Sequence, residues 1–110
     1  MTSATNTKDN DAIWYLYILR CEGETLYTGI TTDVERRFSE HLVGEARGAK
    51  YTKMAKPREL AYSLPIGSRD IAARMEHRIK RLPKEEKEAV VAARFNLVDL
   101  LKYLKIEEWI

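Results

Sequence analysis

The chain has 110 residues, of which 45% are hydrophobic and 33% charged. Compact domains typically span about 50 to 250 residues, so the length predicts one domain and leaves no room for the core of a second domain. The composition is that of an ordinary soluble globular protein, which folds without disulfides or a cofactor. The net charge of +2 says little about partners until the charges are placed along the chain.

The N-terminal segment, residues 1–11, is polar and contains no apolar run. It is therefore neither a signal peptide nor a membrane anchor, and we expect a disordered tail. The lone cysteine, Cys21, has no partner for an intramolecular disulfide and suits a reducing compartment. These features predict a cytoplasmic protein that does not engage a membrane.

Residues 13–20 are rich in aromatic and β-branched side chains and are apolar on both alternating faces, which predicts a strand that is buried on both sides. A turn with a glycine follows, and residues 25–30 resume a strand composition. The two segments therefore predict an antiparallel hairpin. We expect Tyr17 and Tyr27 to face each other across it.

A helix is expected over about residues 32–43. Thr32 and Glu35 have the spacing of a capping box at its start. Apolar residues then recur every four positions, which predicts a buried stripe made of Val34, Phe38 and Leu42. Arg37 and His41 lie one turn apart on the same helix.

A basic loop follows this helix. Its cations are Arg47, Lys50, Lys53, Lys56 and Arg58. Such a local cluster either neutralises nucleic-acid phosphates or is simply a solvated loop, and the composition alone does not choose between the two.

Residues 58–64 alternate apolar and smaller side chains and end at Pro65, which predicts a third strand. Ser68 can cap a second helix, which Pro83 terminates. The apolar stripe of this helix consists of Ile71, Met75, Ile79 and Leu82. Glu76 lies just beside the stripe.

Pro83 suits the first position of a third helix, and residues 97–106 form a further amphipathic pattern. The sequence thus predicts an α/β fold of the α+β type, with a small three-stranded antiparallel sheet flanked by helices. The expected order is β-β-α-β-α-α with an additional C-terminal helix. Residues 95–110 are expected to form a helical extension that packs on the same domain.

The chain resembles the GIY-YIG endonuclease family, and specifically its small stand-alone bacterial members. The segment Tyr15-Leu16-Tyr17 is similar to the first motif of the family, and Tyr27-Thr28-Gly29 is similar to the second. Leu16 and Thr28 stand where both motifs carry isoleucine, and Tyr15 stands where the first motif carries glycine. The resemblance implies a nuclease domain over residues 12–94.

The resemblance also implies the residues of an active site. Tyr17, Tyr27, Arg37 and His41 match catalytic positions, and Glu76 matches the glutamate that binds one divalent metal ion, Mg²⁺ or Mn²⁺. Lys50, Lys53 and Arg58 are the expected contacts to DNA phosphates. The family often has an asparagine near the end of the domain, but Asn96 could equally be a helix cap and is left out of the predicted site.

The activity implied by the resemblance is metal-dependent hydrolysis of DNA phosphodiester bonds, in duplex or branched DNA. Either tyrosine could help to deprotonate the attacking water. Two alternatives stay open: a nucleic-acid-binding module of the same fold with little turnover, and a subunit that a partner protein targets to DNA. Each residue alone also has a structural explanation, and Glu76 with Lys80 could be an ordinary surface ion pair. The sequence does not indicate an oligomeric state.

Overall fold

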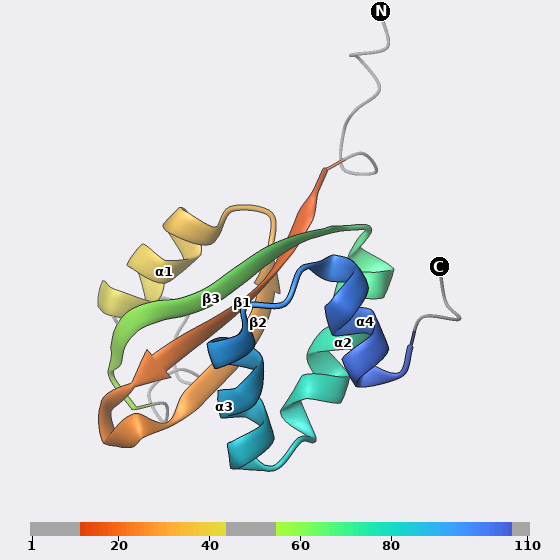
Figure 1. The fold of residues 1–110 in the computed structure, drawn as a ribbon. Helices are drawn as coiled ribbons and strands as arrows, with labels where there is room; N and C mark the ends of the chain where they lie inside the picture. The colour runs from red at the N-terminus through yellow and green to blue at the C-terminus, as the bar shows by residue number, and fades with distance from the viewer. Residues whose placement is uncertain (1–11, 44–54, 107–110) are drawn as a thin grey trace, which may run out of the picture.

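The structure is a computed structural model that describes residues 12–43 and 55–106. Its three strands are β1 (Trp14–Cys21), β2 (Leu26–Thr31) and β3 (Pro57–Gly67). They form one antiparallel sheet in the order β2-β1-β3, with β1 in the centre (Figure 1). The predicted fold class is therefore confirmed.

Strand β1 is covered on both faces, as its composition predicts. Leu16 and Ile18 belong to one buried cluster, and Tyr17 and Leu19 belong to another. All four side chains are almost inaccessible to solvent, because consecutive side chains of a strand point to opposite faces and helices cover both. Every side chain of this central segment therefore lies in one of two cores.

The predicted hairpin forms, but its register differs from the expected one. A 3₁₀ turn at Glu22–Glu24 joins β1 to β2, and Gly23 within it has a φ of 78°. Tyr17 lies opposite Gly29, and Tyr27 lies opposite Leu19. The expectation that the two tyrosines face each other was wrong, because the turn shifts the pairing by two residues. They are diagonal neighbours on one face of the sheet.

Strand β3 is longer than the predicted segment 58–64. It begins at Pro57, so Arg58 lies on the strand and not in the preceding loop, and it continues through Pro65 to Gly67. Proline is tolerated there because β3 is an edge strand, where a missing N–H does not remove a bond to a second neighbour. Pro65 pairs with Tyr15, next to a shift in register.

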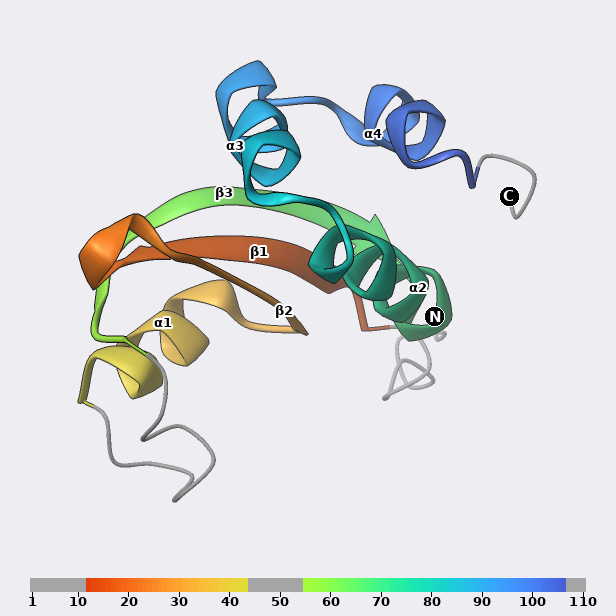
Figure 2. The same cartoon turned by 90° about the horizontal axis from the view of Figure 1, so that it is seen from below.

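The helices divide between the two faces of the sheet. Helix α1 (Val34–Val43) lies on the face that carries Tyr17, whereas α2 (Arg69–Lys80), α3 (Lys84–Ala93) and α4 (Leu97–Leu104) lie on the other side (Figure 2). In the described part of the chain, no helix is both long enough and apolar enough to cross a membrane.

Local signals set the ends of these helices. The Ser68 hydroxyl accepts a hydrogen bond from the Ile71 N–H, so Ser68 caps α2 as predicted. Asn96 caps α4 by accepting from the Asp99 N–H at 2.9 Å, which is the structural role considered for it. Pro83 precedes the first turn of α3 instead of occupying its first position.

Helix α1 differs from the prediction in its cap and in its buried face. The Asp33 carboxylate accepts from the Arg36 N–H at 3.1 Å, and thereby performs the capping expected of Thr32. Leu42 is 45% exposed, whereas His41 is 5% exposed. Positions i, i+4 and i+7 also share one face of a helix, so His41 takes the inward position after Val34 and Phe38.

The larger core lies between the sheet and the three helices α2, α3 and α4. It joins Leu16 and Ile18 of β1 to Met75 of α2 and Val90 of α3. Helix α4 contributes Leu100, Leu101 and Leu104, and Ile106 follows them. The segment after Asn96 therefore shares the hydrophobic core of the sheet, because its apolar side chains are buried there and not in a separate cluster.

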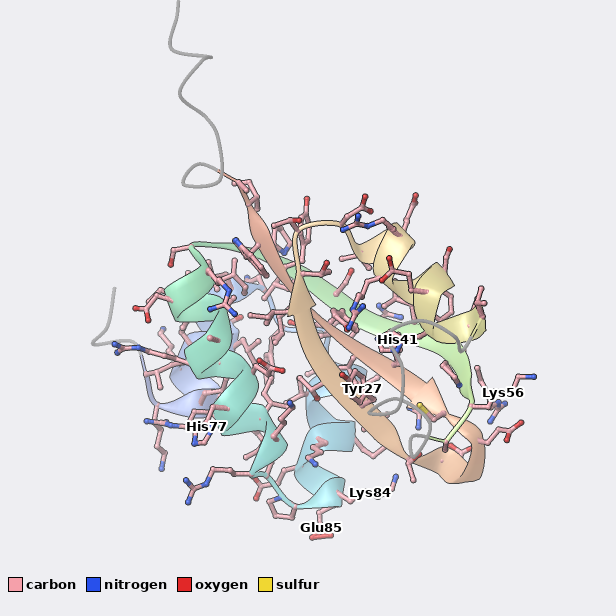
Figure 3. All side chains as sticks on the ribbon, turned by 180° about the vertical axis from the view of Figure 1, so that it is seen from behind. Tyr27, His41, Lys56, His77, Lys84 and Glu85 are labelled. Carbon is pink, nitrogen blue, oxygen red and sulfur yellow. The ribbon has the colours of Figure 1, made fainter. Side chains whose placement is uncertain are left out.

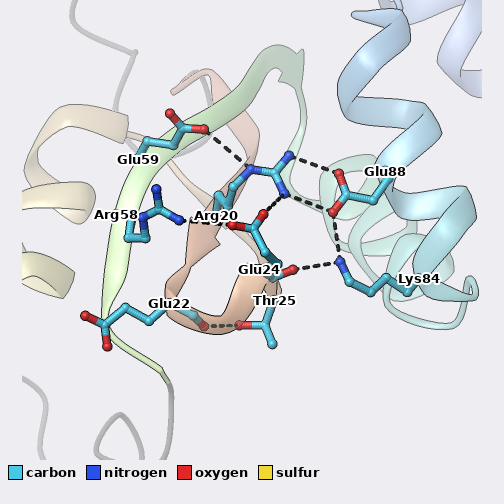
Figure 4. A network of polar contacts seen from close by, with 8 residues as sticks. All are labelled: Arg20, Glu22, Glu24, Thr25, Arg58, Glu59, Lys84 and Glu88. Carbon is cyan, nitrogen blue, oxygen red and sulfur yellow. Dashed lines mark hydrogen bonds and ion pairs between the residues drawn. The ribbon is translucent and has the colours of Figure 1, made fainter.

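An ion-pair network centred on Arg20 connects the end of β1 to α3 (Figure 4). The Arg20 guanidinium donates two hydrogen bonds of 2.9 Å to the carboxylate of Glu88 and also contacts Glu24 and Glu59. Lys84 donates to Glu88 at 2.8 Å and to the backbone carbonyl of Glu24 at 2.7 Å. The network fixes α3 against the hairpin turn because the paired guanidinium and carboxylate groups restrict orientation as well as distance.

Replacing Glu88 by glutamine is expected to lower the free energy of unfolding near pH 6 by about 1 kcal/mol, since a charged hydrogen-bonded pair is lost at a partly exposed position. Arg20 and Lys84 lower the pKa of Glu88 from 4.5 to about 2. The stabilisation is thus complete above pH 4.5 and is lost as the pH falls through 2. Urea unfolding across this range should show the wild type and the variant converging.

Glu85→Gln provides the control, because Glu85 is an exposed residue in the first turn of the same helix. We expect its free energy of unfolding to remain close to that of the wild type. A stability difference for Glu88→Gln that does not change between neutral and acidic pH would contradict the proposed role of the charge.

Candidate active site

Three aromatic side chains meet between the sheet and α1. The Tyr17 hydroxyl lies 3.1 Å from Nε2 of His41, in a buried hydrogen bond. The Tyr27 ring lies edge-on to the His41 ring with centroids 5.1 Å apart, and it lies 6.4 Å from the Tyr17 ring. Figure 3 shows Tyr27 and His41 side by side, far from His77 on α2. The structure thus brings together three of the predicted catalytic residues from three different elements.

Gly29 makes room for the Tyr17 side chain. A Cβ atom at position 29 would lie 2.5 Å from the Tyr17 hydroxyl oxygen and 2.6 Å from the ring carbon that bears it. Both distances are far shorter than a van der Waals contact, so any side chain would displace the ring. The glycine is required here for space, because Tyr17 lies across the backbone of the neighbouring strand.

Arg37 lies one helical turn before His41, and its charge reaches the imidazole. Burial lowers the pKa of His41 below its ordinary value, the charge of Arg37 lowers the pKa further, and Glu40 opposes both by raising it. Arg37 donates a hydrogen bond of 2.8 Å to the Glu40 carboxylate. The imidazole is therefore surrounded by one positive and one negative charge on its own helix.

This arrangement is suited to proton transfer. A lowered pKa favours the neutral imidazole, which has one nitrogen that accepts and one that donates. When the proton is on Nδ1, Nε2 accepts the hydrogen bond from the Tyr17 hydroxyl. A phenol bonded to a neutral imidazole can pass its proton to that ring, so the pair has the chemistry of an acid–base relay.

Glu76 lies in a different layer of the molecule. It is on α2, whose neighbouring residues Met75 and Ile79 are buried with Leu16 on the face of the sheet opposite to Tyr17. Its side chain is 22% exposed, and its carboxylate forms an ion pair of 3.0 Å with Lys80. Helix α2 also packs against β2, the edge strand that carries Tyr27. The edge of the sheet thus lies between Glu76 and the group formed by Tyr17, Tyr27 and His41.

The predicted DNA contacts are only partly described. Lys50 and Lys53 lie outside the described residues. Arg58 is exposed on β3, and its guanidinium forms an ion pair of 3.1 Å with Glu24. It therefore belongs to the edge of the Arg20 network (Figure 4).

Together these features define a class of protein: a small α+β domain that holds a buried tyrosine–histidine pair and an arginine against one face of a three-stranded sheet. The GIY-YIG catalytic domain matches residues 13–89. Because this match covers most of the chain, the chain belongs to the GIY-YIG family. The resemblance predicted from the sequence motifs is confirmed.

Bacterial relatives cover nearly the same length. The chain is 44% identical over 95 residues to the UPF0213 protein YhbQ of Escherichia coli O139:H28, which covers 86% of this chain and 93% of that protein. It is 46% identical over 92 residues to the YhbQ protein of Escherichia coli O8, with 84% and 90% covered. The solution NMR structure of the UPF0213 protein BH0048 from Bacillus halodurans has 39% identity and a TM-score of 0.49, covering 74% of this chain and 85% of that one.

Two residues of the site were not found from the sequence. Gly29 was recognised only as part of a motif, although a glycine in the middle of a strand is itself a signal of close approach by another group. Glu40 follows Arg37 by three positions, a spacing that permits an ion pair on a helix. It forms an ion pair with Arg37 and raises the pKa of His41. Its effect on His41 depends on burial, which the spacing does not reveal.

Gly29→Ala is expected to lower the free energy of unfolding by about 1 to 3 kcal/mol, because the added methyl group displaces the Tyr17 ring. The hydrogen bond between Tyr17 and His41 should be lost with it. A double-mutant cycle provides the control: in a Tyr17→Leu background the same Gly29→Ala change should cost much less. Equal costs in both backgrounds, measured by urea unfolding, would show that the ring is not the obstacle.

Glu40→Gln should lower the pKa of His41 further, since it removes the charge that raises this pKa and leaves the effect of Arg37 unopposed. The measurement is an NMR titration of the His41 imidazole. Glu35→Gln, which changes an exposed carboxylate in the first turn of the same helix, is the matched control and should leave the His41 titration nearly unchanged. A rise in the pKa of His41 in Glu40→Gln would contradict this electrostatic role.

Proposed function

We propose that this protein is an endonuclease that hydrolyses DNA phosphodiester bonds with the help of one divalent metal ion, Mg²⁺ or Mn²⁺. The observation that carries the proposal is the buried hydrogen bond between Tyr17 and His41, held over Gly29 and next to the charge of Arg37. Packing alone has no need of a buried phenol–imidazole pair beside a guanidinium. The match to the GIY-YIG catalytic domain supports a catalytic role for this pair.

In the proposed reaction, Tyr17 accepts the proton of the attacking water as its own hydroxyl proton moves to Nε2 of His41. Tyr27 packs against the histidine ring and keeps it oriented. Arg37 binds the phosphate and compensates the charge that develops on it, because its planar guanidinium can donate to two oxygens at once. This requires Arg37 to exchange its bond with Glu40 for one with the phosphate.

The proposed protein ligands suit a metal ion that is bound partly by the protein and partly by the substrate. Among the described residues, no group of three or more His, Cys, Asp or Glu side chains is arranged to hold an ion. A single partly exposed carboxylate, Glu76, fits Mg²⁺ or Mn²⁺ only if waters and phosphate oxygens supply the other ligands, which is common for Mg²⁺. When bound, the ion would polarise the phosphate and stabilise the leaving 3′ oxygen.

DNA binding is proposed to involve Lys50, Lys53 and Arg58 as phosphate contacts. One observation favours a second candidate function, a nucleic-acid-binding module with little turnover: Glu76 is paired with Lys80, in a layer of the structure that does not contain Tyr17. In that case the tyrosine–histidine pair would be retained for structure, and a partner protein could supply the targeting or the chemistry.

The direct test is a cleavage assay with purified full-length protein. Duplex, nicked, branched and single-stranded DNA are each incubated with Mg²⁺ or Mn²⁺, and a chelator removes the ion in parallel samples. Metal-dependent cleavage of any of these substrates supports the endonuclease. DNA binding without cleavage under all conditions supports the binding module.

Arg37→Lys should reduce cleavage at least about tenfold while the fold survives, since lysine keeps the charge but not the planar pair of donors. Arg36→Lys is the matched control, because Arg36 is the adjacent arginine of α1, is 66% exposed and contacts the same Glu40 at 3.9 Å. It should cleave at nearly the wild-type rate. Equal rates for the two variants would remove Arg37 from the site.

Glu76→Ala separates the two candidate functions. If Glu76 holds the metal, the variant should lose cleavage and keep DNA binding, or even bind DNA more tightly because a negative charge near the phosphate is gone. Asp70→Ala is the control, since Asp70 forms a similar i,i+4 ion pair with Arg74 on the same helix. Cleavage that persists in Glu76→Ala, or that is lost equally in Asp70→Ala, would rule out the metal-binding role.

A further inference from the structure

A cleft lies on the side of the sheet opposite to Tyr17, where the ends of α2 and α4 approach the start of α3. It has a volume of about 510 Å³. Its lining is mainly cationic and aromatic and consists of His77, Arg78, Arg81, Leu82, Glu86, Tyr103, Leu104 and Lys105. Figure 2 shows α2 and α4 on the side of the sheet that α1 does not cover. The cleft therefore shares no wall with the Tyr17–His41 site.

Three side chains of arginine and lysine line this cleft, and within the described residues only one of them has a contact that supports the fold. Arg78 donates a hydrogen bond to the backbone carbonyl of Leu104, and so ties α2 to the end of α4. The side chains of Arg81 and Lys105 form no hydrogen bond or ion pair with any residue that the structure describes. Among the described residues, Glu86 is the single carboxylate of the lining. The cleft thus carries an excess of positive charge.

Helix geometry explains how these cations are tolerated. Arg81 and Lys105 are the C-cap residues of α2 and α4, and the carboxyl end of a helix carries a partial negative charge. This field offsets part of the repulsion but falls off within one turn and provides no ligand for the side chains. Two side chains whose donors have no partner among the described residues therefore line one cleft.

The volume and the lining together indicate the kind of ligand. A cleft of about 510 Å³ is larger than a single phosphate needs and lies within the range of small-molecule sites. Tyr103, which packs against Phe95 with ring centroids 5.2 Å apart, supplies an aromatic surface on which a base can stack. Cations next to an aromatic ring form a common combination for binding nucleotides of a single strand.

We propose that this cleft binds a nucleotide unit, with its phosphate on Arg81 and Lys105 and its base against Tyr103. The nucleotide comes either from a single strand of nucleic acid or from a free nucleotide, since both offer the same phosphate and base. The proposal does not depend on the nuclease activity, because the cleft and the Tyr17–His41 site lie on opposite sides of the sheet.

The test uses the full-length protein with a chelator present, so that cleavage does not interfere. An oligothymidylate strand and ATP are titrated separately while backbone amide signals are followed by NMR. Signals of Arg81, Tyr103 and Lys105 are expected to shift with at least one of the two ligands. Shifts with the strand alone assign the site to nucleic acid, and shifts with ATP alone assign it to free nucleotide. The absence of shifts at these residues with both ligands would overturn the proposal.

Variants then test the charges themselves. If the strand binds, each lost phosphate contact lowers the slope of log K against log salt by about 0.7, so Arg81→Gln with Lys105→Gln should lower it by about 1.4. The ratio of the wild-type affinity to the variant affinity should accordingly fall about sevenfold between 50 and 200 mM salt. If ATP binds instead, the same double variant should abolish the shifts at Tyr103.

Lys87→Gln with Lys102→Gln is the matched control, since it removes two cations of α3 and α4 that do not line the cleft. It should change neither the salt slope nor the ATP shifts. Without ligand, the cleft variant should unfold at the same temperature as the wild type or higher, because repulsion between its cations is relieved. A lower unfolding temperature, or an equal loss of binding in the control, would show that these cations serve the fold or act only through net charge.

Discussion

Between Leu16 and Leu19 the central strand β1 has no face in contact with water, and this constraint organises the molecule. In this segment the even-numbered residues complete a core with α2, α3 and α4, and the odd-numbered residues complete a core with α1. A polar group on such a strand must find a partner inside the protein, because an unpaired buried hydroxyl costs about 1 to 3 kcal/mol. The Tyr17 hydroxyl meets this requirement through His41. The position of α1 is thus linked to a polar interaction as well as to apolar packing.

The same constraint creates the chemical properties of the site. Burial keeps the imidazole neutral, and Arg37 strengthens this effect while Glu40 limits it. A neutral imidazole that is hydrogen-bonded to a phenol can accept a proton from it. In an exposed histidine with the same neighbours, water would screen the electrostatic effects of the two charges. Gly29 belongs to this arrangement because it leaves the space in which the phenol lies. Stability and the proposed proton transfer therefore depend on the same few contacts.

The opposite layer is held by different forces. Its core is mainly aliphatic, and the Arg20 network fixes α3 to the turn between β1 and β2 (Figure 4). The hydrogen bonds between the two groups raise the pKa of Arg20 and lower that of Glu88, so the charged form of each stabilises the other. Glu76 and the cationic cleft also belong to this layer. The proposed metal ligand, Glu76, and the proposed proton relay, Tyr17 with His41, therefore lie in different layers of the molecule. A substrate phosphate that contacts both would have to lie across the edge strand β2.

The sequence by itself determined the order of the elements, the class of the sheet and the family. These properties follow from local patterns: an apolar run on both faces for β1, the cap at Ser68, and two short tyrosine motifs. Only the tertiary structure decided the register of the hairpin and the inward position of His41 in place of Leu42. A turn that is one residue longer or shorter changes every residue pair between β1 and β2. In α1, the stripe that begins with Val34 and Phe38 can continue through either His41 or Leu42. The choice in each case depends on contacts between residues far apart in the chain, above all between Tyr17 and His41.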